Sequence, residues 1–134
     1  MKLELKEEIR NKFVKKVEEL SGENLLACYQ CGRCSGGCPS VPFMDLLPNQ
    51  VIRLAQLGMK EEVLSSKAIW VCASCFTCFV RCPKGVDLAK VMEALRQIQL
   101  RQNIDYVEPL KLSKKEIVEL PQIALVSSFR KSTA

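Results

Sequence analysis

The chain has 134 residues, of which 48% are hydrophobic but only 6% are aromatic, and its formal net charge is +5 without any histidine. This length fits one domain with a thin aliphatic core, which needs support from something other than packing. Its lysines and arginines alternate with glutamates instead of clustering, so the sequence excludes the basic patch that is typical of nucleic-acid-binding proteins.

The cysteines and the apolar stretches together indicate where the protein is located. Residues 1–16 contain no apolar segment followed by a small-residue cleavage site, and the longest uncharged stretch, residues 68–80, is too short to cross a bilayer. We therefore expect a cytoplasmic protein without membrane insertion, whose cysteines are reduced thiols and not disulfides.

The first predicted element is a helix over residues 5–20, which Gly22 is expected to end. Its apolar residues recur at helical spacing on one face: Leu5, Ile9, Phe13, Val17 and Leu20. We interpret residues 1–22 as an N-terminal amphipathic helix that packs by this face and exposes its charged side.

Four cysteines follow within residues 28–39, which read CYQCGRCSGGCP. Cysteines at positions i, i+3 and i+6 can wrap one side of a compact inorganic cluster, and the closing proline ends that turn and redirects the chain. Gly32, Gly36 and Gly37 are expected to let the backbone come close to the cluster.

The segment after this motif is predicted to be helical after an initial run of turns. A helix is expected from Pro48 to about Leu57, with Gly58 after it, and a short helical turn over residues 60–66 follows. Residues 1–110 show no convincing alternation typical of a strand, so the sequence predicts a mainly α fold.

A second motif, CASCFTCFVRCP at residues 72–83, repeats the spacing C-x2-C-x2-C-x3-C-P with a constant offset of 44 residues, from Cys28 to Cys72. All eight cysteines of the chain lie in these two motifs. In two-cluster proteins with this run, the fourth cysteine of each motif ligates the other motif's cluster. The sequence therefore predicts two [4Fe–4S] clusters, with ligands Cys28, Cys31, Cys34 and Cys82 for the first and Cys72, Cys75, Cys78 and Cys38 for the second.

The second motif has no glycine between its cysteines and carries Phe76, Phe79 and Val80 instead. We expect these apolar side chains to exclude water from the second centre. Because reduction adds negative charge, a drier site with fewer hydrogen-bond donors is expected to have the lower reduction potential.

Other uses of the cysteines fit this pattern less well. Structural zinc takes two separated pairs of ligands, commonly with histidine. A thioredoxin-like C-x-x-C motif does not need a third and a fourth cysteine, and disulfides would require export. Two clusters are therefore the interpretation that we prefer.

The second motif leads into another helix, for which Asp87 is a suitable N-cap. An apolar stripe extends to about Gln102 and consists of Leu88, Val91, Met92, Leu95 and Ile98. We interpret residues 23–104 as the two-cluster core.

The tail has a different character. Ser113 and Glu116 form a capping box for a short helix over residues 112–120, which Pro121 is expected to end. Residues 122–134 are apolar and then basic, and they are too short for a core of their own. Such a segment is either disordered or docked, and we favour docking of residues 105–134 on a partner.

With both motifs and the helical spacer in place, the chain resembles the C subunits of cytoplasmic heterodisulfide reductases. The resemblance rests on the runs GENLLACYQCGRCSGGCPSVPFMDLLPNQVIRLAQLG and IWVCASCFTCFVRCPKGVDLAKVMEALR, and it covers roughly residues 15–100. It implies an alpha-helical ferredoxin fold with two [4Fe–4S] clusters between helices and the eight cysteines as their ligands.

The resemblance also implies partners and a role. The A subunit of such enzymes carries flavin and clusters and is where electron bifurcation occurs, and the B subunit carries the CCG motifs that reduce the disulfide. The C subunit would relay electrons between them. The chain has no two adjacent cysteines, no GxGxxG fingerprint and no histidine base, so we expect no catalytic residue and no active site of its own.

Three alternatives remain open at this point. The first alternative is a free-standing diffusible ferredoxin. The second is the iron–sulfur component of a succinate- or glycerol-phosphate-type dehydrogenase, and the third is a redox sensor. Against the dehydrogenase component, the chain has no upstream C-x4-C-x2-C segment for a [2Fe–2S] centre. Against the redox sensor, it has no DNA-reading element. The sequence leaves open the electron donor, the terminal acceptor and the order of the two clusters.

Overall fold

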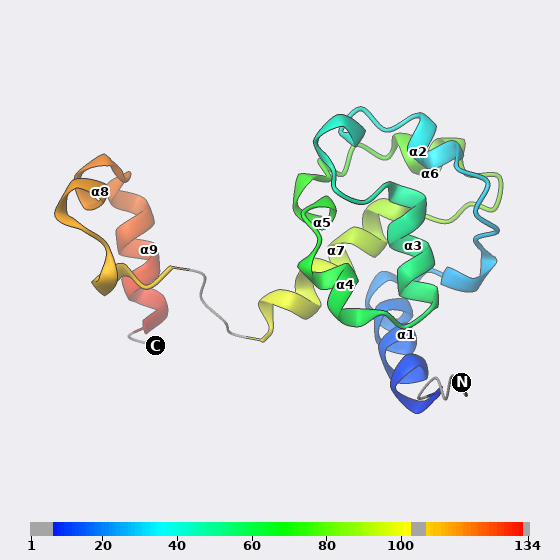
Figure 1. Ribbon diagram of the computed structural model, residues 1–134, viewed down its shortest axis with the longest axis horizontal. Helices are drawn as coiled ribbons and strands as arrows, with labels where there is room; N and C mark the ends of the chain where they lie inside the picture. Colours follow the sequence, from blue (N-terminus) through cyan, green and yellow to red (C-terminus); the bar gives the residue numbers. More distant parts are fainter. Residues whose placement is uncertain (1–6, 103–106, 133–134) are drawn as a thin grey trace, which may run out of the picture. The chain divides into compact units, whose positions relative to one another are not determined.

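The computed structural model describes the backbone of residues 7–102 and 107–132 and the side chains of residues 12–102 and 107–130. Every regular element in these residues is helical, which confirms the mainly α fold (Figure 1). The chain divides into two compact units, Met1–Gln102 and Asn103–Ala134, and each is described by itself.

The first unit contains seven α-helices and two 3-10 turns in its described part. They are α1 (Glu7–Ser21), η1 (Leu25–Ala27), α2 (Arg33–Gly36), η2 (Val41–Phe43), α3 (Pro48–Gln56), α4 (Lys60–Ser65), α5 (Ala68–Val71), α6 (Thr77–Arg81) and α7 (Leu88–Leu100). The described part of the second unit contains η3 (Pro109–Lys111), α8 (Lys114–Glu119) and α9 (Gln122–Ser132).

Helix α1 forms where the apolar spacing predicted it. Phe13 and Val17 are buried and Leu20 is partly buried, while Leu5 and the side chain of Ile9 lie outside the described residues. Gly22 ends the helix in the left-handed conformation, with φ +69°, and its N–H donates to the carbonyl of Glu18.

Helices α3 and α4 also match the prediction. Helix α3 begins at Pro48 as its first residue, and Gly58 after its end has φ +73°. One face of α3 is buried and the opposite face is exposed, because Val51, Ile52 and Ala55 recur at helical spacing.

Helix α7 is the central element of the first unit. The Asp87 carboxylate accepts hydrogen bonds from Ala89 N–H at 3.0 Å and Lys90 N–H at 3.4 Å, so it is the N-cap that the sequence predicted. Helices α1, α4, α5 and α6 all pack against α7, and Figure 1 shows α2 and α6 side by side at the end of the unit away from the N-terminus.

Leu95 on α7 tests this description of the core. Its side chain is fully buried, whereas Leu100 on the same helix is 63% exposed. Leu95→Ala is expected to lower the free energy of unfolding by about 2–5 kcal/mol, because it removes transfer energy and leaves a cavity. Leu100→Ala, the matched control, is expected to cost ~0.5 kcal/mol or less. Anaerobic denaturant unfolding measures both, and equal losses would contradict the assignment of the core.

The second unit contains a helix that the sequence did not predict. Helix α8 begins with the expected capping box, in which Ser113 N–H donates to Glu116 Oε2 at 2.9 Å and Glu116 N–H donates to Ser113 Oγ at 3.4 Å. Pro121 ends α8, but it also starts α9, since Ala124 N–H donates to the Pro121 carbonyl. None of the described side chains between residues 107 and 130 is buried.

Candidate metal centres

The two cysteine motifs repeat in structure as well as in sequence. Gln30 and Gly32 have φ +63° and +76°, and their counterparts 44 residues later, Ser74 and Phe76, have φ +51° and +60°. Each loop then enters a short helix, α2 or α6, at equivalent positions. Positive φ at three non-glycine residues costs free energy and persists only where the surroundings fix it, so both loops are held in one particular wrap.

Each loop encloses a cavity that is lined by four cysteines. The first cavity is lined by Cys28, Cys31 and Cys34 of the first motif and by Cys82 of the second. The second cavity is lined by the complementary set: Cys72, Cys75, Cys78 and Cys38. The structure therefore brings together the same two sets of cysteines that the spacing rule predicted.

The two cavities match each other in size. They hold about 360 and 380 Å³ of empty space, part of it open to solvent, as expected for two copies of one prosthetic group. Among the described residues, no group of three or more cysteine, aspartate or glutamate side chains is arranged to hold a single metal ion. Four thiols around a cavity suit a compact cluster with several metal atoms.

Polar side chains from the core helices hold the start of each motif. Gln56 of α3, which is buried, donates to the carbonyls of Leu25 at 2.7 Å and Cys28 at 3.0 Å. Arg96 of α7 donates to the carbonyls of Ile69 at 3.0 Å and Cys72 at 3.1 Å. These two pairs of acceptors occupy equivalent positions of the repeat. Gln56 therefore anchors the backbone of the first motif in the same way as Arg96 anchors that of the second.

Asp45 fixes the approach to the second motif. Its carboxylate accepts hydrogen bonds from Ser66 Oγ at 2.8 Å, Lys67 N–H at 2.8 Å and Ala68 N–H at 2.9 Å. These donors lie at the start of α5, which ends immediately before Cys72. Desolvation by burial raises the pKa of Asp45, but the hydrogen bonds outweigh it and lower the pKa to about 2.

Asp45→Ala is expected to lower the free energy of unfolding by about 0.5–2 kcal/mol at pH 7, because it removes a helix cap. The folded-state pKa lies below the unfolded one, so this contribution is full above about pH 4 and is lost as the pH falls towards 2. The difference between wild type and variant should therefore be constant from pH 8 to 5 in anaerobic melts. Glu62→Ala, an exposed carboxylate on α4, is the control. A difference that narrowed between pH 7 and 5 would contradict this role.

Burial keeps two of the cavity thiols protonated in the absence of metal. It raises the pKa of Cys78 to about 11 and also raises the pKa of Cys34, while the Thr77 hydroxyl and N–H lower the pKa of the exposed Cys75. Since thiolates are the ligands of iron, loading of each cavity releases protons.

The prediction that three apolar side chains exclude water from the second centre is wrong. Phe76, Phe79 and Val80 are 49%, 43% and 82% exposed, so they do not exclude water from the cavity. Phe76 has a left-handed backbone with φ +60°, and Phe79 and Val80 lie on α6. They form an exposed apolar surface beside the second motif.

Glycine has a further use in the first motif. A Cβ atom on Gly37 would lie 2.5 Å from Cδ of Arg81, so a side chain at position 37 would require the exposed Arg81 side chain to move. Gly37 and Arg81 occupy equivalent positions of the repeat, and the arginine side chain passes over the glycine. Gly32 lines the first cavity and adopts a φ of +76°, which side chains rarely adopt.

Comparisons with known proteins support an iron–sulfur interpretation. Residues 27–87 match the family model described as a 4Fe-4S dicluster domain. The chain is 38% identical over 88 residues to the C subunit of the H(2):CoB-CoM heterodisulfide,ferredoxin reductase of Methanothermobacter thermautotrophicus, covering 66% of this chain and 48% of that protein. It is 35% identical over 115 residues to the C2 subunit of the H(2)/formate:CoB-CoM heterodisulfide,ferredoxin reductase of Methanococcus maripaludis, covering 80% of this chain and 61% of that protein.

A third relative, the iron-sulfur C subunit of the CoB--CoM heterodisulfide reductase of Methanopyrus kandleri, is 38% identical over 85 residues, covering 63% of this chain and 44% of that protein. The chain thus spans about half the length of such curated relatives. In the part of the chain that the structure describes, no helix is long and apolar enough to cross a bilayer. Residues 27–87 are therefore a 4Fe-4S dicluster domain that holds two [4Fe–4S] clusters and serves electron transfer, in a chain homologous to the C subunits of heterodisulfide reductases.

Proposed function

We propose that the eight cysteines ligate the two clusters in a crossed arrangement. The first cluster takes Cys28, Cys31, Cys34 and Cys82, and the second takes Cys72, Cys75, Cys78 and Cys38. The observation that supports it is that each of these sets lines one cavity. When bound, the clusters take up and release single electrons. The protein's part is to hold each group at a fixed place, with Gln56 and Arg96 anchoring the two motifs.

We further propose that the chain is the electron relay of a cytoplasmic heterodisulfide-reductase-like complex. Its partners are a flavin-containing A subunit, which donates electrons by bifurcation, and a CCG-type B subunit, which reduces the disulfide. The names of the relatives support this role. So does the composition, because the sequence has no histidine and no adjacent cysteines for disulfide cleavage, and ligation would occupy all eight thiols.

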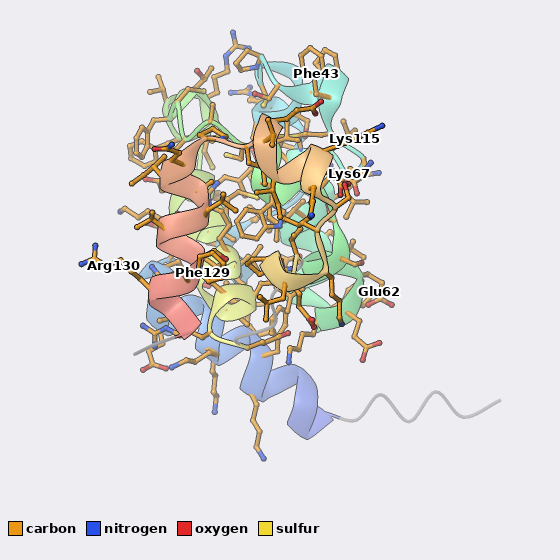
Figure 2. All side chains as sticks on the ribbon, turned by 90° about the vertical axis from the view of Figure 1, so that its left-hand side faces the viewer. Phe43, Glu62, Lys67, Lys115, Phe129 and Arg130 are labelled. Carbon is orange, nitrogen blue, oxygen red and sulfur yellow. The ribbon has the colours of Figure 1, made fainter. Side chains whose placement is uncertain are left out.

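Exposed apolar side chains support permanent docking. Phe43 is 76% exposed, and Figure 2 shows its side chain at the outer edge of the first unit. In the second unit, Ile123, Val126 and Phe129 recur at helical spacing along α9 and are 73%, 52% and 47% exposed. A helix with apolar residues at this spacing is suited to a hydrophobic groove on a partner, and we propose that residues 105–134 dock there.

An anaerobic pull-down from the native cells, with the full chain as bait and mass spectrometry as readout, tests this proposal. Recovery of two further proteins in equal amounts, one that contains flavin and one that is rich in CCG motifs, would support the relay. The matched control is Ile123→Asp/Phe129→Asp, which leaves the cysteine motifs unchanged and should recover less of the partners. Recovery of the chain alone, or with many partners in small amounts, would favour the diffusible ferredoxin. A succinate-type flavoprotein would favour the dehydrogenase component.

A further inference from the structure

The first cavity is bordered by a chain of hydrogen-bonded side chains that the second cavity lacks. Gln30 and Asn49 line the first cavity, whereas Ser40 is the only polar residue other than cysteine that lines the second in the described structure. Asn49 Nδ2 donates to Gln30 Oε1 at 3.4 Å, and Gln30 Nε2 donates to Cys28 Sγ at 3.4 Å. The chain therefore ends on the sulfur of a cysteine in the first cavity.

Ser35 fixes the direction of this chain. Its hydroxyl oxygen accepts from Asn49 N–H at 3.0 Å, and its proton is donated to Asn49 Oδ1 at 2.6 Å. With this orientation of the Asn49 amide, its nitrogen faces the oxygen of Gln30, and the amide nitrogen of Gln30 faces Cys28 Sγ. The neighbouring hydrogen bonds therefore hold the donor towards the sulfur.

We propose that Gln30, positioned by Asn49, makes the site of Cys28, Cys31, Cys34 and Cys82 the more easily reduced of the two. Reduction adds negative charge to the cluster and to its cysteine sulfurs, so a fixed N–H donor stabilises the reduced form more than the oxidised form. A chain that holds one electron therefore holds it at the first site. This inference rests on the crossed ligation proposed above.

The other donors on cysteine sulfur do not cancel this difference. Val86 N–H donates to Cys82 Sγ at 3.4 Å, which also favours the first site. At the second site, the Thr77 hydroxyl, 3.4 Å from Cys75 Sγ, and the Thr77 N–H both face Cys75, but this pair is exposed, so water competes for the same sulfur. The two bonds at the first site are partly buried.

The repeat supplies a matched pair of variants. Gln30 and Ser74 occupy equivalent positions with φ +63° and +51°, so glycine suits the backbone at both. Gln30→Gly removes the donor to Cys28, whereas Ser74→Gly removes only an acceptor for Arg96. Potentiometry of the holo protein, followed by EPR under anaerobic conditions, gives the two midpoint potentials of each variant.

Gln30→Gly should lower the higher potential and leave the lower one unchanged. At fixed applied potential, the ratio of reduced to oxidised cluster should fall by roughly threefold to tenfold, where tenfold is about 59 mV for one electron. Ser74→Gly should leave the higher potential unchanged. Asn49→Ala removes the support of Gln30 without changing a residue of its loop, although it also removes the acceptor of the Ser35 hydroxyl. It should give a smaller drop of the same potential even if Gln30→Gly loads poorly.

Three results would overturn the inference. The first is two identical midpoint potentials in the wild type, and the second is a Gln30→Gly variant in which the lower potential shifts or neither potential shifts. The third is a drop of the higher potential in Ser74→Gly that equals the drop in Gln30→Gly. Failure of the crossed ligation is recognised separately. Cys31→Ala/Cys82→Ala would then lose both clusters, which the iron content reports independently of the potentials.

Discussion

The double variant Cys31→Ala/Cys82→Ala is expected to retain about four irons per chain, as many as either single variant. The two cysteines come from different motifs but line the same cavity. If both ligate the first cluster, the second substitution removes a ligand from a site that the first has already emptied. The two effects are then not additive, and the second cluster keeps all four of its ligands. Iron analysis and EPR of anaerobically purified protein measure the outcome.

The matched control combines Cys31 with the last cysteine of its own motif. Cys31→Ala/Cys38→Ala is expected to lose both clusters, because Cys38 lines the second cavity. Ligation within each motif would give the reverse pattern, with iron retained in Cys31→Ala/Cys38→Ala and lost in Cys31→Ala/Cys82→Ala. That reversal would contradict the crossed assignment.

Removal of both clusters by chelation is expected to release the two motifs while much of the helical core survives. Residues 26–47 and 70–85, which contain all eight cysteines, have no buried side chain, so packing alone does not hold them. Each crossed ligation closes a loop of tens of residues, and a covalent cross-link of that length contributes about 4 kcal/mol. Most of the buried aliphatic side chains on α1, α3 and α7, such as Val17, Val51 and Leu95, do not line the cavities.

Limited trypsin digestion with mass spectrometry checks this expectation. Arg33, Arg81 and Lys84 are exposed cleavage sites within the motifs. They should be cut in the chelated protein and protected in the holo protein, and the melting temperature should fall on chelation. Cys31→Ala, which loses only the first cluster, should show an intermediate melting temperature. Equal digestion and equal melting with and without iron would contradict a structural role of the clusters.

The sequence predicted the elements whose signals are local. Asp87 as an N-cap, Pro48 as a first helical residue and the capping box of Ser113 and Glu116 all occur as expected. The cysteine sets were predicted from a spacing rule, because the same 44-residue repeat that is visible in the sequence brings the fourth cysteine of each motif to the other cavity.

Residues that anchor the motifs over long distances were missed. Gln56 contacts Cys28 across 28 positions of the sequence and Arg96 contacts Cys72 across 24, so no local pattern indicates either pair. Asp45 lies in a turn-rich segment, and its role depends on α5 beginning 23 residues later. The one available signal for these anchors was Gln56, a glutamine at one of the otherwise apolar, buried positions of α3.

Helices were missed where they are too short for a periodic pattern or where a proline has two roles. Helices α2, α5 and α6 have four or five residues and follow from the wrapping of the cysteine loops. The sequence predicted Pro121 only as the end of α8, although proline is equally suited to precede a helix. The remaining error concerned exposure, because Phe76, Phe79 and Val80 are exposed to solvent and do not cover the second cavity.

Reduction of one partner by the other through this chain tests the relay most directly. The flavin-containing and CCG-rich proteins from the pull-down are mixed anaerobically after the flavin protein is reduced, and freeze-quench EPR follows the CCG-rich protein. Rapid reduction is expected with the wild-type chain, and none with Cys31→Ala/Cys38→Ala, which is expected to lack both clusters. Equal reduction with the cluster-free variant, or without the chain, would contradict it.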